Sequence, residues 1–220
     1  MTEHITAPKS RSMQWQWWQS VARRIRVPLG FFTAAVYLVE VVRHPWHPKA
    51  IAWSVALVLP GLLLRAAASG TVKKNRELTV TGPYAYTRNP LYLGSMLMAA
   101  GFALALMSWP VALLVAGGFA AIYAPVIASE ERFLRAAFAG FDGYCRSVPR
   151  FIPRFTAAKF PDESDSPSGS PDGSRAAAGG FSLALYLKHR EYNAAIGAAL
   201  LYLSLLCLRP VLEDLLRRAW

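Results

Sequence analysis

Cysteine and charged residues are both scarce in this sequence of 220 residues. Its two cysteines, Cys145 and Cys207, lie far apart and form no disulfide framework, metal-binding motif or redox motif. We expect each to be a small apolar residue that is buried or faces lipid. Charged residues make up 17% of the chain, against about a quarter in a typical soluble domain, and hydrophobic residues make up 54%. This composition predicts an integral membrane protein rather than a soluble one.

The sequence also lacks the local signatures of several enzyme classes. It contains no glycine-rich dinucleotide fingerprint, no phosphate-binding loop and no nucleophile elbow. No cluster of Cys, His and Asp has the spacing of metal ligands, so we expect no metal site. Residues 1–26 are polar and rich in tryptophan, and they contain no short apolar core that would mark a cleavable signal peptide.

The formal net charge of +11 arises from arginines and lysines placed between apolar blocks. Cations in such places fit the loops of a membrane protein, so we expect the lipid bilayer and not nucleic acid as a partner. Five of them lie in residues 1–26, five in 65–90 and nine in 129–190, whereas the turn between the third and fourth apolar segments has none. This bias predicts that the three cation-rich regions, and the N-terminus with them, are cytosolic. The expected location is the bacterial inner membrane.

Five apolar segments predict an all-α integral membrane bundle of about five transmembrane or re-entrant helices. The segments are residues 27–42, 50–64, 91–107, 109–128 and 193–208. Pro60 predicts a kink in the second segment. Only residues 108–110 can turn the chain between the third and fourth segments, which predicts a tight antiparallel hairpin with Gly101, Gly117 and Gly118 at close helix contacts. The fifth segment is short, so whether it crosses the membrane or lies in the interface stays open.

The chain divides into four regions. A basic, aromatic N-terminal arm covers residues 1–26, and its second half is either an interfacial helix or a disordered tail. The membrane core covers residues 27–155, and apolar residues at helical spacing up to Pro149 predict that it ends in one amphipathic cytosolic helix. A flexible linker rich in Ser, Pro, Gly and Asp covers residues 156–180. A C-terminal extension with an additional apolar helix covers residues 181–220.

Two polar stretches interrupt the apolar pattern and carry most of the functional information. The first covers residues 82–94, and the second begins at Glu130 and Glu131 and continues into residues 148–154. On the predicted topology both stretches lie at the same face of the membrane. Charged groups at the edge of the hydrocarbon region are costly unless they serve a function, so this cytosolic face is the predicted site.

Each stretch has a structural and a functional interpretation. Asn89 and Pro90 follow ordinary rules for the start of a helix, with Asn89 as the N-cap. Glu130 and Glu131 are either a solvated continuation of the helix, or paired with Arg132 or Arg135 in a salt bridge, or carboxylates that hold a cationic or polyhydroxyl ligand. The three tyrosines of the first stretch add aromatic faces, which attract sulfonium and ammonium groups.

The two stretches together match a known family. The matching residues are Gly82-Pro83-Tyr84, Arg88-Asn89-Pro90-Leu91-Tyr92-Leu93-Gly94, Glu130-Glu131 with Leu134 and Phe138, Tyr144, and Val148-Pro149-Arg150. At this spacing, and separated by a helical hairpin, they resemble the isoprenylcysteine carboxyl methyltransferase and phospholipid methyltransferase superfamily across residues 50–154. The resemblance implies a small multi-helix membrane enzyme that uses S-adenosylmethionine without a Rossmann domain.

The resemblance also implies where the site lies. The cofactor-binding residues that it implies are Leu78, Thr79, Tyr84, Asn89, Pro90, Leu91, Tyr92 and Glu130, and the catalytic residues are Arg88, Glu131 and Arg150. Two positions depart from the family pattern. Asn89 stands where the carboxyl methyltransferases have histidine, and Phe141 replaces a tyrosine in a stretch that is one residue shorter.

The implied reaction is methyl transfer from S-adenosylmethionine at the cytosolic membrane interface. The acceptor stays open between an isoprenylcysteine-type carboxylate, a phospholipid amine and a small thiol or hydroxyl. Because the sulfonium already activates the methyl group, we expect positioning groups, with Arg88 or Arg150 orienting a carboxylate, rather than a dedicated base. The alternatives are an NADPH-dependent membrane reductase of similar helical layout and a non-enzymatic membrane protein. The oligomeric state also stays open.

Overall fold

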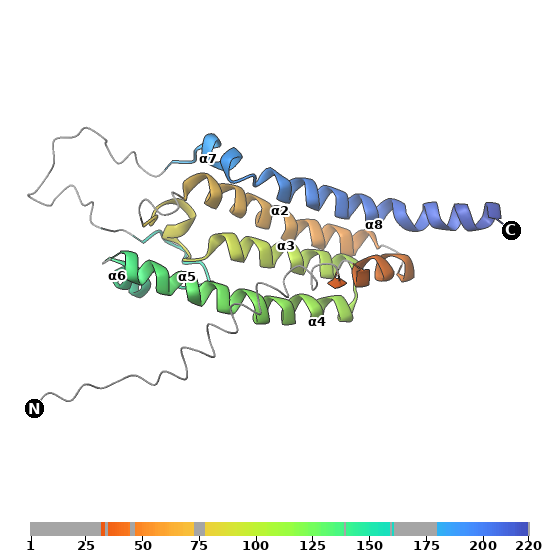
Figure 1. The fold of residues 1–220 in the computed structure, drawn as a ribbon. Helices are drawn as coiled ribbons and strands as arrows, with labels where there is room; N and C mark the ends of the chain where they lie inside the picture. The colour runs from red at the N-terminus through yellow and green to blue at the C-terminus, as the bar shows by residue number, and fades with distance from the viewer. Residues whose placement is uncertain are drawn as a thin grey trace, which may run out of the picture.

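The computed structural model describes residues 32–33, 35–44, 47–72, 78–138, 140–158, 160 and 180–219. The predicted N-terminal arm and nearly all of the predicted linker lie outside these residues. Every regular element in the described part of the chain is helical, which confirms the all-α prediction. Figure 1 shows the long helices lying side by side along one bundle, with the C-terminal helix running past its end.

The helices follow the apolar segments with shifted ends. In chain order the elements are helical residues 35–43, α2 (Pro48–Thr71), the 3₁₀ turn η1 (Gly82–Ala85), α3 (Pro90–Leu106), α4 (Trp109–Gly118), the π-helical η2 (Phe119–Tyr123), α5 (Ala124–Ala137), α6 (Phe141–Ser147), α7 (Leu183–Lys188) and α8 (Tyr192–Ala219). α2 continues through Pro60 and runs seven residues beyond the predicted end at residue 64. Three alanines follow Arg65, and alanine is the strongest helix former, so the helix extends into the stretch predicted as a connection.

α2 and α3 pack with their backbones in close contact. A Cβ atom added at Gly61 would lie 2.7 Å from the carbonyl oxygen of Gly94, and one added at Gly101 would lie 2.9 Å from that of Ser54. The prediction that Gly101 permits a close helix contact is therefore right, although its partner is α2 rather than α4. The same prediction is wrong for Gly117, because no atom lies within 4 Å of a Cβ added there.

The predicted hairpin between the third and fourth segments is present. α3 ends at Leu106, Met107 takes a left-handed conformation with φ of 48°, and Ser108 caps α4 by accepting a hydrogen bond from the Val111 amide at 3.4 Å. The Ser108 hydroxyl also donates to the buried carboxylate of Glu40 at 2.5 Å. This bond joins the helix of residues 35–43 to the hairpin turn.

From α4 the chain continues as one helix of 29 residues, Trp109–Ala137. Pro125 has no N–H to donate to the preceding turn and its ring crowds that turn, which accounts for the π-helical residues of η2 just before it. The predicted single amphipathic helix up to Pro149 is wrong, because Phe138 is extended and the helix restarts at Phe141. This break turns α6 so that Phe141, Tyr144 and Val148 form a second small core against residues 78–80.

In the part of the chain that the structure describes, two helices are long and apolar enough to cross a membrane: Pro48–Thr71, with mean hydropathy 1.8, and Trp109–Ala137, with mean hydropathy 2.2. Only 22% and 17% of their most apolar windows are buried, unlike the core helix of a soluble protein. Large side chains such as Trp53 and Leu113 point outward, as expected for helices that contact lipid. The apolar stretches Pro90–Leu106 and Tyr192–Leu208 are shorter.

The C-terminal extension packs along the rest of the bundle. The predicted fifth segment and the tail after it form one helix, α8, which continues through Pro210. The Tyr37 hydroxyl donates to the carbonyl of Leu201 at 2.9 Å, and the hydroxyls of Ser54 and Tyr202 lie 2.8 Å apart. These polar contacts between apolar helices fix α8 against α2 and the helix of residues 35–43.

Candidate active site

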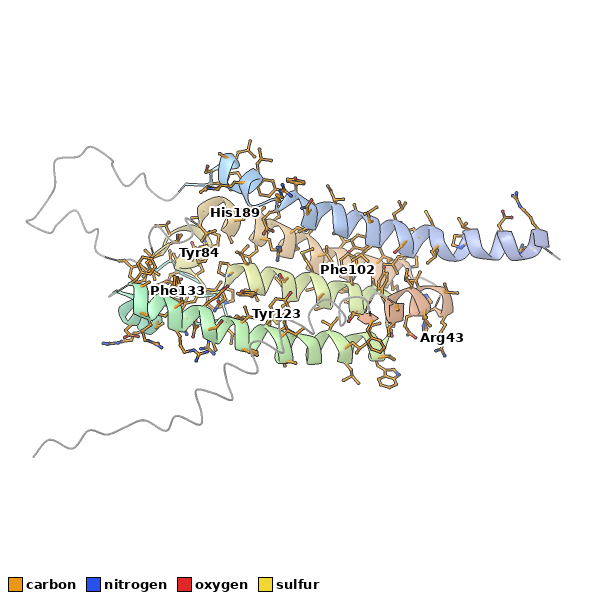
Figure 2. All side chains as sticks on the ribbon, viewed as in Figure 1. Arg43, Tyr84, Phe102, Tyr123, Phe133 and His189 are labelled. Carbon is orange, nitrogen blue, oxygen red and sulfur yellow. The ribbon has the colours of Figure 1, made fainter. Side chains whose placement is uncertain are left out.

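One end of the bundle holds a cavity of about 480 Å³. Its walls come from the C-terminal part of α2, residues 78–79, η1, the start of α3, α5 and α6. In Figure 2, Tyr84 and Phe133 lie at this end of the bundle, and Arg43 lies at the opposite end. The polar stretches are therefore gathered where the apolar helices end.

Nearly all of the predicted site residues line this cavity. They are the eight predicted cofactor-binding residues Leu78, Thr79, Tyr84, Asn89, Pro90, Leu91, Tyr92 and Glu130, together with the predicted catalytic residues Arg88 and Glu131. Arg150 is not among the lining residues, and its guanidinium binds Glu131, which does line the cavity. The roles of these residues remain predictions.

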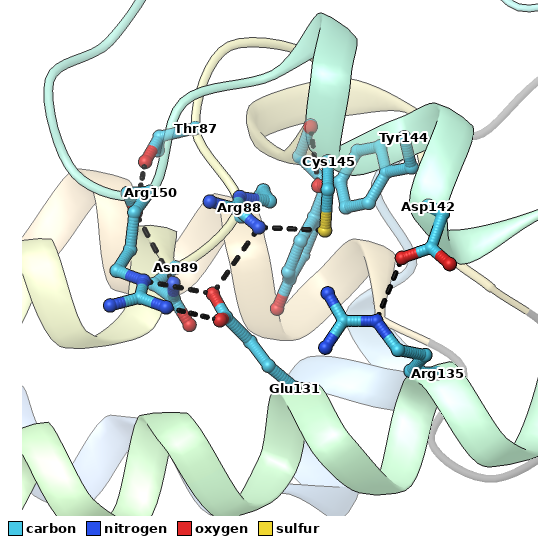
Figure 3. A network of polar contacts seen from close by, with 10 residues as sticks. Thr87, Arg88, Asn89, Glu131, Arg135, Asp142, Tyr144, Cys145 and Arg150 are labelled. Carbon is cyan, nitrogen blue, oxygen red and sulfur yellow. Dashed lines mark hydrogen bonds and ion pairs between the residues drawn. The ribbon is translucent and has the colours of Figure 1, made fainter. Parts of the chain in front are cut away.

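Glu131 is held between two arginines. It is buried, with 7% of its surface exposed. The Arg150 Nε donates to Oε1 at 3.0 Å, its Nη2 donates to Oε2, and the Arg88 Nη1 lies 3.4 Å from Oε1 (Figure 3). The bond with Glu131 raises the pKa of Arg150. The interpretation of Glu131 as a solvated helix residue is thus wrong, since its arginine partners come from other segments and Arg135 pairs with Asp142 at 2.7 Å.

Hydrogen bonds join the two polar stretches, and they end on backbone carbonyls of the second stretch. The Arg88 amide donates to the carbonyl of Pro149 at 2.9 Å, and the Thr87 hydroxyl donates to that of Arg150 at 3.1 Å. Asn89 stands at the N-cap position of α3, but its side chain makes no cap bond and its Nδ2 donates to the Arg150 carbonyl at 3.2 Å. The predicted capping role of the Asn89 side chain is therefore wrong, because its amide group binds the second polar stretch instead of the start of α3.

Arg88, which lines the cavity, has an incomplete set of hydrogen-bond partners among the described residues. Its Nη1 donates to the sulfur of Cys145 at 2.7 Å, and its Nε is buried with no hydrogen-bond partner among the described residues. Beside it, the Tyr144 hydroxyl donates to the carbonyl of Tyr84 at 2.8 Å. A buried donor without a partner is costly, so Arg88 is a group that an anionic ligand oxygen would satisfy after a small side-chain adjustment.

Aromatic rings and a carboxylate form the other side of the cavity. The Tyr92 hydroxyl donates to Glu130 at 2.9 Å, and the Tyr92 ring meets Tyr123 edge to face with centroids 5.4 Å apart. Burial raises the pKa of the Tyr84 phenol well above its usual value, and the neighbouring Glu130 charge adds to the rise. Rings and a carboxylate in one place attract cations such as sulfonium and ammonium.

Several lining residues were not assigned to the site from the sequence, although Leu134, Phe138 and Tyr144 belong to the family motif. The additional residues are Arg65, Val72, Ser95, Tyr123, Phe133, Leu134, Phe138, Phe141 and Tyr144. A cation that ends an apolar segment is a signal that could have found Arg65. Tyr123 stands seven residues before Glu130, which is the spacing of two helical turns on one face, so the same periodicity could have found it.

Comparison with known proteins finds one family whose model matches part of the chain. The model of the phospholipid methyltransferase family matches residues 62–140. The predicted family resemblance is confirmed. The match includes all of α3, α4 and α5 and most of the residues that line the cavity.

Two curated relatives match a similar share of the chain. Over 84 residues the chain is 39% identical to the cobalt-zinc-cadmium resistance protein CzcN of Cupriavidus metallidurans and 38% identical to the nickel-cobalt-cadmium resistance protein NccN of Alcaligenes xylosoxydans xylosoxydans. Each match covers 38% of this chain and 39% of the relative. No solved structure matches the chain.

The described part of the chain offers no alternative centre for metal chemistry. Among its residues, no group of three or more His, Cys, Asp or Glu side chains could hold a metal ion. The cavity itself offers a carboxylate beside aromatic rings for a cation, and an arginine for an anion.

Proposed function

We propose that the cavity binds S-adenosylmethionine and that the protein is a membrane methyltransferase acting on a lipid-like or small acceptor. The observation that carries this proposal is the convergence of ten of the eleven predicted site residues on one cavity. The volume of about 480 Å³ is within the range of roughly 300–1,000 Å³ that is typical of ligand pockets. The match of residues 62–140 to the phospholipid methyltransferase family supports the same reaction class.

The donor set of the cavity fits this cofactor. The cofactor carries a sulfonium and an ammonium group, which the Tyr84 and Tyr92 rings and the Glu130 carboxylate would hold. It also carries a carboxylate, which suits the unpartnered Nε of Arg88. When bound, it supplies a methyl group that the sulfonium already activates.

The protein's own contribution in this proposal is positioning and exclusion of water. The apolar walls formed by Phe133, Phe138 and Phe141 keep water from the reacting centre. An acceptor with an apolar tail can approach from the lipid side, because Arg65 and Tyr123 line the cavity from within the apolar helices. A carboxylate acceptor needs no proton removed, whereas an amine acceptor would have to lose a proton before the methyl group is transferred.

We propose further that the cavity opens on the cytosolic side of the membrane. Described arginines of the two cation-rich stretches, such as Arg65, Arg88 and Arg150, lie at this end of the bundle, and positively charged loops favour the cytosolic side. The acceptor is one of the three classes named above, and the family points to a lipid-type acceptor in general terms.

Calorimetry of the detergent-purified protein tests the proposal. Saturable binding of S-adenosylmethionine and of S-adenosylhomocysteine is expected, and Glu130→Gln should weaken it while leaving thermal unfolding unchanged. A matched control is Asp142→Asn, which removes a carboxylate paired with Arg135 outside the described cavity lining. Binding of NADPH without S-adenosylmethionine would favour the reductase alternative, and binding of neither by folded protein would favour the non-enzymatic one.

A further inference from the structure

The C-terminal extension, which lies outside the family match, is anchored at the cavity end of α2. The Ser182 amide donates to the carbonyl of Gly70 at 2.9 Å, and the His189 ring nitrogen lies 2.9 Å from the carbonyl oxygen of Ser69. The ring of Phe181 fills the space beside Gly70, where an added Cβ would lie 2.3 Å away. The last four carbonyls of a helix have no partner within the helix, so the extension satisfies two of them and gains a fixed position.

This anchoring brings Glu191 to Arg65. The Glu191 Oε2 accepts hydrogen bonds from Arg65 Nη2 at 2.7 Å and Nε at 3.1 Å. Both side chains are largely buried, with 24% of Arg65 and 14% of Glu191 exposed. The remaining Arg65 nitrogen, Nη1, donates to the Ser95 hydroxyl and lies 3.5 Å from the carbonyl oxygen of Leu91. Arg65 thus joins the extension to the first turns of α3.

The ion pair balances a charge in the cavity wall. Arg65 lines the cavity, and Leu91 and Ser95, which it contacts, line it as well. Without Glu191 its positive charge would be uncompensated in a poorly solvated place, where charges act over long distances. Burial raises the pKa of Tyr84 on another wall most strongly, and the charges of Glu130 and Glu191 add to that rise.

We propose that Glu191 is a specificity-determining residue of this site, although it lies outside residues 62–140. It holds Arg65 against the cavity wall and cancels its charge, so that the cavity accepts a ligand that carries a sulfonium cation. This role rests on the proposed binding of S-adenosylmethionine. It makes the C-terminal extension part of the ligand site, with Glu191 as a positioning residue that acts through Arg65.

Two ligands that differ in one charge test this role. S-adenosylmethionine has a sulfonium, whereas S-adenosylhomocysteine has a neutral thioether in its place. Calorimetry on the full-length protein in detergent gives both dissociation constants and their ratio. In Glu191→Gln, binding of S-adenosylmethionine should weaken by roughly threefold to tenfold more than that of S-adenosylhomocysteine, as for a unit charge about 12–20 Å away at an effective dielectric constant of about 20.

Two further variants distinguish an effect of charge on the affinity ratio from an effect of structural damage. Arg65→Gln removes the opposite charge, so it should shift the ratio the other way and favour S-adenosylmethionine. The double variant Arg65→Gln/Glu191→Gln should return the ratio to the wild-type value. Arg65→Gln and the double variant also keep the proposal testable if Glu191→Gln fails to fold. Asp214→Asn is the matched control, since Asp214 pairs with Arg218 at 2.8 Å near the far end of α8.

The outcomes distinguish this role from the proposed function. Wild-type protein that binds S-adenosylmethionine, with the ratio shifted in opposite directions by the two single variants, supports the role. Equal weakening of both ligands in Glu191→Gln, or an unchanged ratio, would overturn it while leaving the methyltransferase proposal intact. Wild-type protein that binds neither ligand would overturn the proposed function and this role of Glu191 together.

Discussion

The hydroxyl of Tyr92 donates a 2.9 Å hydrogen bond to the carboxylate of Glu130 and so joins the first turn of α3 to α5 at the cavity. The two residues come from the two polar stretches, 38 positions apart in the chain. Both line the cavity, and Tyr123 packs against the Tyr92 ring. The bond sets the direction of a carboxylate that is otherwise exposed, which is what recognition of a cationic ligand group requires.

Tyr92→Phe should separate this positioning from stability. The variant keeps the ring and removes only the hydroxyl. Because Glu130 is exposed and can be hydrated, the free energy of unfolding should change by less than about 1 kcal/mol. Affinity for S-adenosylmethionine should fall by roughly threefold to tenfold, measured by calorimetry. The exposed Tyr86, replaced by Phe, is the control, and equal affinity in Tyr92→Phe and wild type would refute the assignment.

Glu131→Gln should lower the free energy of unfolding. The change leaves Arg88, which is 15% exposed, without a compensating carboxylate. A fully buried pair costs about 3–5 kcal/mol to break, but Arg150 is 48% exposed, so we expect a loss of about 1–3 kcal/mol. Thermal unfolding followed by circular dichroism measures this loss. Arg150→Gln should cost less, because Arg88 still partners Glu131, and the opposite order would contradict this account of the cluster.

The residues singled out from the sequence lie at the polar edge of the cavity, whereas few of those that line it from within the helices were singled out. Residues 82–94 and Glu130–Glu131 were found because antiparallel helices return their loops to one end of a bundle. Tyr123 was missed because the face that a long apolar helix presents cannot be chosen from hydrophobicity alone, and only its seven-residue spacing from Glu130 marks it. The break at Phe138 was missed because Phe141 and Tyr144 continue the helical spacing.

Contacts between distant segments were harder still to predict. Glu191 lies 126 residues from Arg65 and follows a stretch rich in Ser, Pro and Gly, so no local pattern connects them. The bond from Asn89 to the Arg150 carbonyl was also not predicted, because a rule for helix starts already accounted for Asn89. Local rules explain why a residue type is tolerated at a position, but its partner depends on the tertiary fold.

Gly94→Ala should destabilise the bundle by forcing α2 and α3 apart. A Cβ added there would lie 2.7 Å from both the Gly61 carbonyl oxygen and the Arg65 Cγ, and the backbone atom cannot move aside. We expect a loss of about 1–3 kcal/mol, measured by thermal or denaturant unfolding in detergent. Gly117→Ala is the matched control, because no atom lies within 4 Å of a Cβ added at this helical position. The free energy of unfolding should rise by up to about 1 kcal/mol. Equal effects of the two changes would rule out the close packing described here.

Tyr84→Phe should make the protein more resistant to alkaline pH. Burial raises the pKa of the Tyr84 phenol in the folded state, while the unfolded chain keeps the ordinary value of about 10. Above that pH the unfolded state loses a proton that the folded state retains, so the free energy of unfolding falls as pH rises. One such group contributes up to about 1.4 kcal/mol per pH unit.

Unfolding measured at pH 9 and pH 11 tests this contribution. Below about pH 10 both states hold the proton, so wild type and Tyr84→Phe should differ little in pH dependence there. Between the two pH values wild type should lose more stability than the variant. Tyr144→Phe should also lose less stability than wild type between the two pH values, because burial raises the pKa of Tyr144 as well. It should be less stable than Tyr84→Phe at both pH values, since it loses the 2.8 Å hydrogen bond to the Tyr84 carbonyl. An equal loss of stability in wild type and Tyr84→Phe would mean that the Tyr84 phenol titrates alike in the folded and unfolded states and is not shielded in the cavity wall.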